Sequence, residues 1–362
     1  LSLWGRATLY RDEWGVPHIQ ADDLRAMAFA FGYAQAEDHA EKMLMAYRIV
    51  SGSAAELMGE TYASSDEFAL QMAHSDLAQA AYSGADDVTR DLCEGFALGV
   101  NSWLFEQGEG APRGADGVSP ADPLALLHAF LMSMAPFDFA DIEHPLRGMP
   151  SGNAWAVAPE RTKEGRSLLV MNPHANYDGP YQWYECHLAV GDWFNVSGAT
   201  LFGLPMVLMG HNGQAGWALS PNDPDFADLY VEPAPQFARN PKSFMQYTPN
   251  DTLYWLKLAV DSKPYYVATE SGMLERRVPR LMTGRGPVIG RQAGRNLAYR
   301  VGGYGEFGAL RQVFDMARAS NVDEMQQALA QHQLPCFHVV AVDAGGGLMY
   351  AFNAKVGEKL NA

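Results

Sequence analysis

The residues of this chain whose types suit chemistry are concentrated between positions 151 and 212. They form the segments Ser151-Gly152-Asn153, Asn172-Pro173-His174 and Gly210-His211-Asn212. A serine hydroxyl can act as a nucleophile, and an imidazole can polarise a carbonyl group. Each also has an ordinary explanation, because Ser151 fits a linker and a histidine is often a hydrogen-bonded structural residue. The order and spacing of the segments therefore carry the functional prediction.

Other signatures of chemistry are missing from the sequence. It has no metalloprotease spacing, no Walker A loop, no strand-linked G-x-G-x-x-G and no G-x-S-x-G motif. Its three cysteines, Cys93, Cys186 and Cys336, are too few and too scattered for a disulfide framework or a zinc site. We predict that all three are ordinary buried thiols.

The charge balance limits the partners of the protein. It has 42 acidic and 26 basic side chains, a net charge of −16, and a pI near 5.0. Such a surface disfavours nucleic acid and anionic membranes. No apolar run reaches the roughly 18 residues of a membrane-spanning helix. The chain opens at Leu1 with no targeting signal, so we expect a processed or trimmed product.

The hydrophobic pattern up to about residue 145 is mostly helical. Asp22 is expected to cap a long helix that runs to Ile49, and Gly52 is expected to end it. Before this helix, residues 11–19 read as a short extended segment ending at a turn. Further helices are predicted at 66–82, 87–105 and 121–134.

The pattern changes after Pro150 to short β-prone runs separated by turn residues. One helix is predicted at 322–332. Strands are predicted at 153–158, 167–171, 182–190, 194–198, 207–210, 253–260, 265–269, 297–301, 337–342 and 348–353. A helical part followed by a strand-dominated part is typical of an α+β fold, not of alternating βαβ units.

Several of these segments, in this order, resemble the penicillin and cephalosporin acylase family of the N-terminal-nucleophile hydrolases. The resemblance covers essentially the whole chain, which makes it far more specific than one short motif. It rests on 11–19, 36–38, Ser151–Pro159, Asn172-Pro173-His174, 183–188, 203–205, 210–212, 286–288, 337–343 and 347–353.

The resemblance implies an αββα sandwich and an amidohydrolase that is made as a self-cleaving precursor. Residues 1–151 then correspond to a mostly helical α subunit with a short linker. Residues 152–362 correspond to the N-terminal portion of a β subunit. A serine that begins the β subunit would act as nucleophile, with its own α-amino group, of pKa about 7.7–8.0, as the base.

The nucleophile position itself departs from the family pattern. Counting back from His174 by the family's spacing places the first β-subunit residue at Gly152, where the family has serine, and Ser151 lies one residue too early. Three explanations remain open. Gly152 is an engineered change that traps an uncut precursor, the chain is a naturally inactive homologue, or Ser151 is the nucleophile and a one-residue bulge precedes Trp155.

The oxyanion hole departs from the pattern as well. The family's backbone donor falls on Pro221, which has no N–H to donate. Either Asn222 supplies the contact after a small shift or the hole is weakened, while His174 is retained to polarise the carbonyl. The family's catalytic asparagine lies beyond the strand pair that ends near Asn353. We therefore expect a remaining β-subunit segment on another polypeptide or beyond a truncation.

By position in the family, the acyl pocket would include Phe137, Tyr184 and Leu208, although core packing explains the same residues. Leu208 stands where glutaryl-specific relatives have arginine, which disfavours an acyl chain that ends in a carboxylate. Catalysis requires no cofactor. Glu143, Asp225 and Asp228 match a structural calcium site of some members, but the acidic run around Asp225 is also typical of a solvated turn.

The sequence thus predicts an acylase that cleaves the amide of small N-acyl substrates, such as penicillin- or cephalosporin-type β-lactams or N-acyl-homoserine lactones, through an acyl-enzyme. The resemblance implies a periplasmic or secreted bacterial protein. The alternative is a catalytically inactive homologue that keeps the cleft as a binding or interaction module.

Overall fold

The computed structural model describes most of the chain. The described residues are 3–135, 151–174, 179, 181–232, 243–247, 253–257, 259–292 and 294–357.

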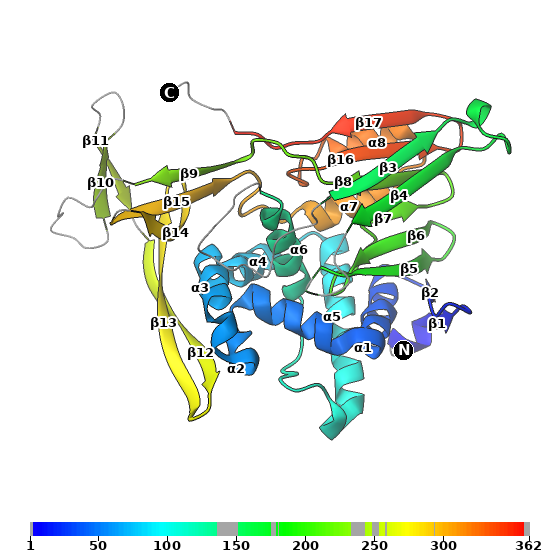
Figure 1. The fold of residues 1–362 in the computed structure, drawn as a ribbon. Helices are drawn as coiled ribbons and strands as arrows, with labels where there is room; N and C mark the ends of the chain where they lie inside the picture. The colour runs from blue at the N-terminus through cyan, green and yellow to red at the C-terminus, as the bar shows by residue number, and fades with distance from the viewer. Residues whose placement is uncertain are drawn as a thin grey trace.

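Helices dominate the first 135 residues (Figure 1). The long helix α1 (Leu24–Ser51) is capped by the carboxylate of Asp23, one residue later than the predicted Asp22. Gly52 ends it as predicted, in the left-handed region with φ of 74°. Helix α1 packs on α5 (Asp87–Gln107). A Cβ added at Gly99 of α5 would lie 1.9 Å from the Phe29 carbonyl oxygen, so glycine allows the two helices to approach closely.

The helix predicted at 66–82 is two helices, because Ala73 adopts a left-handed conformation with φ of 55° between them. Neither glycine nor proline marks this break, so the sequence pattern runs through it. The helix α7 was not predicted from the sequence. The remaining helices are α2 (Ala55–Met58), α3 (Ala63–Met72), α4 (His74–Ser83), α6 (Asp122–Ser133), α7 (Ala309–Arg318) and α8 (Val322–Leu329).

An eight-stranded sheet joins the two halves of the chain in the order β1-β2-β5-β6-β7-β8-β16-β17. Strand β2 pairs with β5 in parallel and the other neighbours are antiparallel. The first part therefore also contributes two strands. The bounds are β1 (Ala7–Arg11), β2 (Pro17–Ala21), β5 (Trp183–Val190), β6 (Phe194–Leu201), β7 (Met209–His211), β8 (Ala215–Ser220), β16 (His338–Asp343) and β17 (Leu348–Phe352).

A separate five-stranded antiparallel sheet has the order β12-β13-β14-β15-β9, and β10 pairs with β11 alone. Figure 1 shows the long β12–β13 ribbon beside α2 and α3. The chain thus has the mixed helix and sheet content predicted for an α+β fold. The bounds are β9 (Ala227–Val231), β10 (Ser243–Tyr247), β11 (Leu253–Lys257), β12 (Ala259–Thr269), β13 (Gly272–Thr283), β14 (Gly286–Gln292) and β15 (Arg295–Val301).

A two-stranded layer, β3 (Ser151–Val157) with β4 (Leu168–His174), packs on β8 and β16 of the eight-stranded sheet. Alternate residues of β8 face different layers. Ser220 contacts this hairpin, whereas the fully buried Trp217 belongs to the main hydrophobic core. The hairpin carries the segment that the sequence singled out, and β8 leads directly to Pro221.

The three cysteines are free and buried, which confirms the prediction of ordinary thiols. Burial raises the pKa of each thiol well above its usual value. None of the described helices is long and apolar enough to cross a membrane.

A buried histidine pair makes the core sensitive to acid. The Nδ1 atoms of His74 and His128 lie 2.8 Å apart, and His128 Nε2 accepts a hydrogen bond from the Gly305 N–H at 3.1 Å. Burial lowers the pKa of His128 from 6.5 to about 4. The unfolded chain therefore binds more protons than the folded chain between these values. We expect His128 to reduce the free energy of unfolding by up to about 3 kcal/mol as the pH falls from 6.5 to 4.

Urea unfolding of the wild type and a His128→Gln variant across this pH range checks the prediction. The titration of Asp66 changes the free energy of unfolding in the opposite direction, because burial raises the pKa of Asp66 from 3.8 to about 7. The readout is therefore the difference between the two proteins, in which the Asp66 contribution cancels. A difference that does not change between pH 6.5 and 4 would show that His128 is not held neutral in the folded protein.

Candidate active site

Position 152 points at the segment that follows β8. Gly152 pairs with Pro173 across the hairpin, and its carbonyl accepts a hydrogen bond from the Ser220 hydroxyl at 2.9 Å. A Cβ added at Gly152 would lie 3.1 Å from Ser220 Oγ and 3.5 Å from Pro221 Cδ. Since the nearest contact is a hydroxyl that can rotate, the site accepts a small side chain. A serine at this position would therefore face Ser220 and Pro221.

Ser151 and His174 lie on the other face of the hairpin. They are cross-strand partners, and successive side chains of a strand alternate between its faces. Ser151 Oγ and His174 Nδ1 are 2.8 Å apart. The structure thus brings His174 to Ser151 and not to the side-chain direction of Gly152.

Two asparagines fix the orientation of the His174 ring. The amide nitrogens of Asn153 and Asn172 lie 2.9 and 3.2 Å from Nε2. Both amide groups are thus within hydrogen-bond distance of this ring nitrogen and hold the orientation of the ring. This role of Asn153 and Asn172 was not predicted from the sequence, although both residues lie within the motifs that contain Ser151 and His174.

The pairing of β3 with β4 is continuous from Ser151 to Val157. Along these described strands the register has no shift. The one-residue bulge before Trp155 that a Ser151 nucleophile would require is therefore not found.

Pro221 and Asn222 follow β8 directly. The Asn222 side chain is buried and bridges two segments. Its Nδ2 donates to the Asn353 carbonyl at 2.9 Å, and its Oδ1 accepts from the Phe337 N–H at 2.7 Å. No backbone hydrogen bond from its own N–H is found among the described residues. The side chain of Asn222 thus has a structural role.

Two of the three predicted acyl-pocket residues are described, and both are buried. Tyr184 and Leu208 are 7% and 2% exposed and belong to the main core. The Tyr184 hydroxyl donates to Asp38 at 2.5 Å, and burial, followed by this hydrogen bond, raises the pKa of Tyr184 well above its usual value. Phe137 lies outside the described residues.

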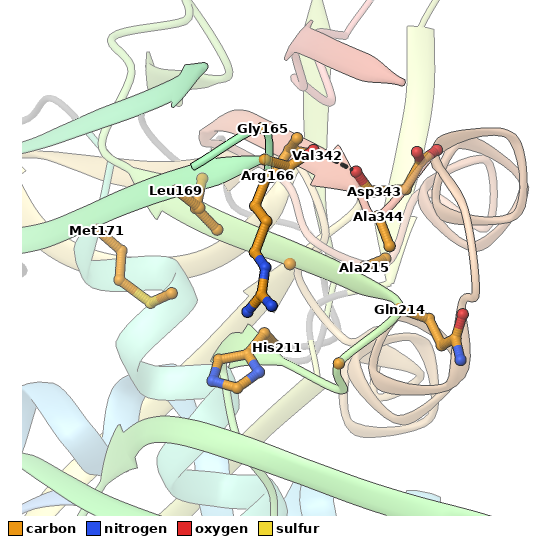
Figure 2. Close-up of a pocket in the computed structure, with 13 residues that line it drawn as sticks. Gly165, Arg166, Leu169, Met171, His211, Gln214, Ala215, Val342, Asp343 and Ala344 are labelled. Atoms are coloured by element: carbon orange, nitrogen blue, oxygen red, sulfur yellow. Dashed lines mark hydrogen bonds between the residues drawn. The ribbon is translucent and has the colours of Figure 1, made fainter. Parts of the chain in front are cut away.

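A pocket of about 480 Å³ lies between the hairpin and the ends of β7, β8 and β16. Leu169 and Met171 form an apolar wall, and Met171 pairs with Ala154, two residues from Gly152. Figure 2 shows the Arg166 side chain extending toward His211. Neither Tyr184 nor Leu208 lines this pocket.

The calcium prediction rests on acidic residues that the structure describes only in part. Asp225 is exposed and Asp228 lies on β9 opposite Arg300, while Glu143 lies outside the described residues. In the part of the chain that is described, no three acidic, histidine or cysteine side chains gather as a metal site. Two carboxylates alone fall short of the six to eight oxygen ligands of Ca²⁺.

The family profile, the related proteins and the solved structure that match this chain are all amidases or acylases. The sequence profile of the penicillin amidase family matches residues 6–359. The acyl-homoserine lactone acylase QuiP of Pseudomonas fluorescens is 23% identical over 92% of this chain and 48% of its own length. The aculeacin-A acylase of Actinoplanes utahensis is 24% identical over 97% and 50%.

A second acyl-homoserine lactone acylase of Pseudomonas fluorescens, PvdQ, is 26% identical over 95% of this chain and 50% of its own length. The chain spans about half the length of these relatives. Among solved structures, a thermostable penicillin G acylase from Alcaligenes faecalis is 23% identical, with a TM-score of 0.46 over 56% of this chain and 35% of its own.

Proposed function

The chain belongs to the penicillin amidase family, and we propose that its site at position 152 is that of an acylase that cleaves small N-acyl amides. The observation that carries the proposal is the direction in which a side chain at position 152 would point. A Cβ added there would lie 3.1 Å from Ser220 Oγ and beside Pro221. Candidate substrates are N-acyl-homoserine lactones and penicillin- or cephalosporin-type β-lactams. This chain lacks the hydroxyl at position 152, and we propose that it is an uncut precursor or a nucleophile variant.

With a serine at position 152, this chain supplies the nucleophile and the base of the reaction. Cleavage of the 151–152 bond frees an α-amine with a pKa of about 7.7–8.0, which takes the proton of the adjacent hydroxyl as the hydroxyl oxygen attacks the substrate carbonyl. The α-ammonium group then returns this proton to the nitrogen of the breaking C–N bond, and the amine product leaves. Water, deprotonated by the same α-amine, attacks the acyl-enzyme and releases the acid and the serine hydroxyl.

The hydrolysis panel that tests this function uses C4–C12 and phenylacetyl amides with the Gly152→Ser variant, expressed together with the remaining β-subunit segment. The apolar wall formed by Leu169 and Met171 supports turnover of apolar acyl groups. Release of amine from at least one class supports the acylase. If no N-acyl amide in the panel is hydrolysed, the enzymatic proposal is wrong.

Pro221 weakens the proposed oxyanion hole, because it cannot donate and the Asn222 N–H lies one residue later. In the Gly152→Ser background, we expect Pro221→Ala to raise kcat by up to roughly 10²–10³-fold, the usual value of one such donor. Steady-state hydrolysis of the best substrate measures this effect. A kcat that is unchanged or lower would mean that position 221 does not face the oxyanion.

We also propose that a remaining β-subunit segment completes the site and the αββα sandwich. Strand β17 lies at the end of the eight-stranded sheet, and Leu348, Tyr350 and Phe352 are 50, 64 and 53% exposed along it. Trp155 on the hairpin is 56% exposed. Exposed apolar side chains of this size, three of them along one strand, favour coverage by further protein.

Two further properties are proposed on the family resemblance alone. One is a periplasmic or secreted location. The other is a structural calcium ion held in part by Glu143, Asp225 and Asp228. Thermal unfolding in calcium and in chelator tests the second.

The second candidate function is a non-catalytic acyl-binding module, which Gly152 and Pro221 favour. Titration of the wild-type protein with an N-acyl amide distinguishes the two. The module predicts binding by the wild type together with no turnover by the Gly152→Ser variant.

A further inference from the structure

Two histidines from different halves of the chain meet where β2 pairs with β5. His18 and His187 are direct partners in this parallel pairing. Their rings are inclined by 74°, and their Nδ1 atoms lie 3.0 Å apart. Both side chains are half-buried. The two nitrogens therefore face each other at a distance that requires a proton or a cation between them.

The outer nitrogens of both rings face oxygen atoms. His18 Nε2 lies 3.5 Å from Asp12 Oδ2, and His187 Nε2 lies 3.1 Å from Asn195 Oδ1. A carboxylate and an amide oxygen only accept hydrogen bonds, so these contacts favour the tautomer in which each Nε2 donates. In that tautomer both Nδ1 atoms present lone pairs to each other.

We propose that His18 and His187 bind one divalent transition-metal ion through their two Nδ1 atoms. Metal–imidazole bonds are about 2.0–2.1 Å long. Two such ligands at a right angle are therefore about 2.9 Å apart, whereas tetrahedral ligands are about 3.4 Å apart. The observed 3.0 Å lies between these two values and nearer the first, and imidazole ligands suit Cu²⁺ and Ni²⁺ as well as Zn²⁺.

The surroundings of the pair are those of a supported metal site. Asp12 is held by hydrogen bonds from the backbone N–H groups of Trp14 and Val16 to its other oxygen, at 2.9 and 3.0 Å. Tyr10 stacks on the His18 ring, with 4.8 Å between centroids. Neighbours thus hold the ring orientation and favour one tautomer, as is usual for histidines that bind a metal ion.

A cavity of about 310 Å³ lies next to His187 and is lined by Tyr10, His187 and Asn195 among others, but not by His18. Within the described ranges no third acidic, histidine or cysteine ligand joins the two rings. The proposed site therefore has two protein ligands, and water would supply the remaining ones.

The ion would join residues before and after position 152, since His18 precedes it and His187 follows it. If the chain is cut as proposed above, the two products remain tied at the β2–β5 pairing. Only this consequence rests on the proposed function. The metal site itself does not.

Titration with Cu²⁺, followed by electron paramagnetic resonance and calorimetry on protein without a histidine tag, tests the proposal. We expect one Cu²⁺ to bind per chain, with a spectrum that shows two equatorial nitrogen ligands. We also expect Cu²⁺ and Ni²⁺ to bind more tightly than Zn²⁺. Asp12→Asn should weaken binding about 10–100-fold. His18→Gln and His187→Gln should each weaken it further.

The matched control is His211→Gln, which removes an exposed histidine from another strand and should leave the affinity unchanged. Circular dichroism establishes that each variant is folded. The proposal is overturned if Cu²⁺ does not bind stoichiometrically at 1:1, or if folded His18→Gln and His187→Gln variants bind it as tightly as the wild type. Because no readout is catalytic, either result is independent of acylase activity.

Discussion

Gly152→Ser, expressed together with the proposed remaining segment, is expected to hydrolyse N-acyl amides that the wild-type chain leaves intact. Glycine has no hydroxyl, so the wild type cannot form an acyl-enzyme at this position. The variant places an oxygen beside Ser220 and Pro221, where a Cβ at position 152 meets no backbone atom closer than 3.4 Å. We expect kcat to rise from undetectable toward the range of about 1–10³ s⁻¹ that enzymes usually show. Release of free amine measures it.

Ser151→Ala separates the two candidate nucleophiles. Added to the Gly152→Ser variant, it should leave hydrolysis largely intact, because Ser151 faces His174 on the other side of the hairpin. Two outcomes would show that Ser151, and not position 152, is the nucleophile. One is that Ser151→Ala abolishes the activity of the Gly152→Ser variant. The other is that the chain with Gly152 is already active and loses this activity with Ser151→Ala.

Asn222→Ala is expected to cause the largest loss of stability among changes near the site. The Asn222 side chain satisfies the Phe337 N–H and the Asn353 carbonyl, and Asn222 is only 7% exposed. Each buried group left without a partner costs about 1–3 kcal/mol. We therefore expect the free energy of unfolding to fall by about 2–5 kcal/mol, measured as a lower urea midpoint.

Gln327→Ala, on an exposed position of α8, is the matched control and should change stability by less than about 0.5 kcal/mol. Asn222→Ala keeps the backbone N–H of residue 222, so this variant tests the role of the side chain alone. An Asn222→Ala protein with an unchanged midpoint would show that this amide does not bridge the two segments.

Local features of the fold could be predicted from the sequence. Gly52 ends α1 because glycine accepts the left-handed conformation of a helix C-terminus, and the apolar run at 182–190 became β5. The break at Ala73 could not be predicted, because an alanine in the left-handed region is held there by tertiary contacts and not by its own preference. The parallel pairing of β2 with β5 depends on residues far apart in the chain.

The candidate site likewise has features that the sequence predicts and features that depend on long-range pairing. Family spacing located Gly152 and Pro221, and the structure brings them to one place. The family spacing did not reveal on which face of the hairpin His174 would lie, because that depends on the cross-strand register of Ser151 with His174. Likewise, nothing in the local sequence indicates that His18 and His187 meet, since sheet topology alone brings them together.

The central claim, that position 152 is the nucleophile position of an acylase of this family, is tested most directly by the intact mass of the Gly152→Ser variant after expression together with the remaining β-subunit segment. We predict two fragments that correspond to a single cut between residues 151 and 152. An uncut chain, or a cut before residue 151, would contradict it.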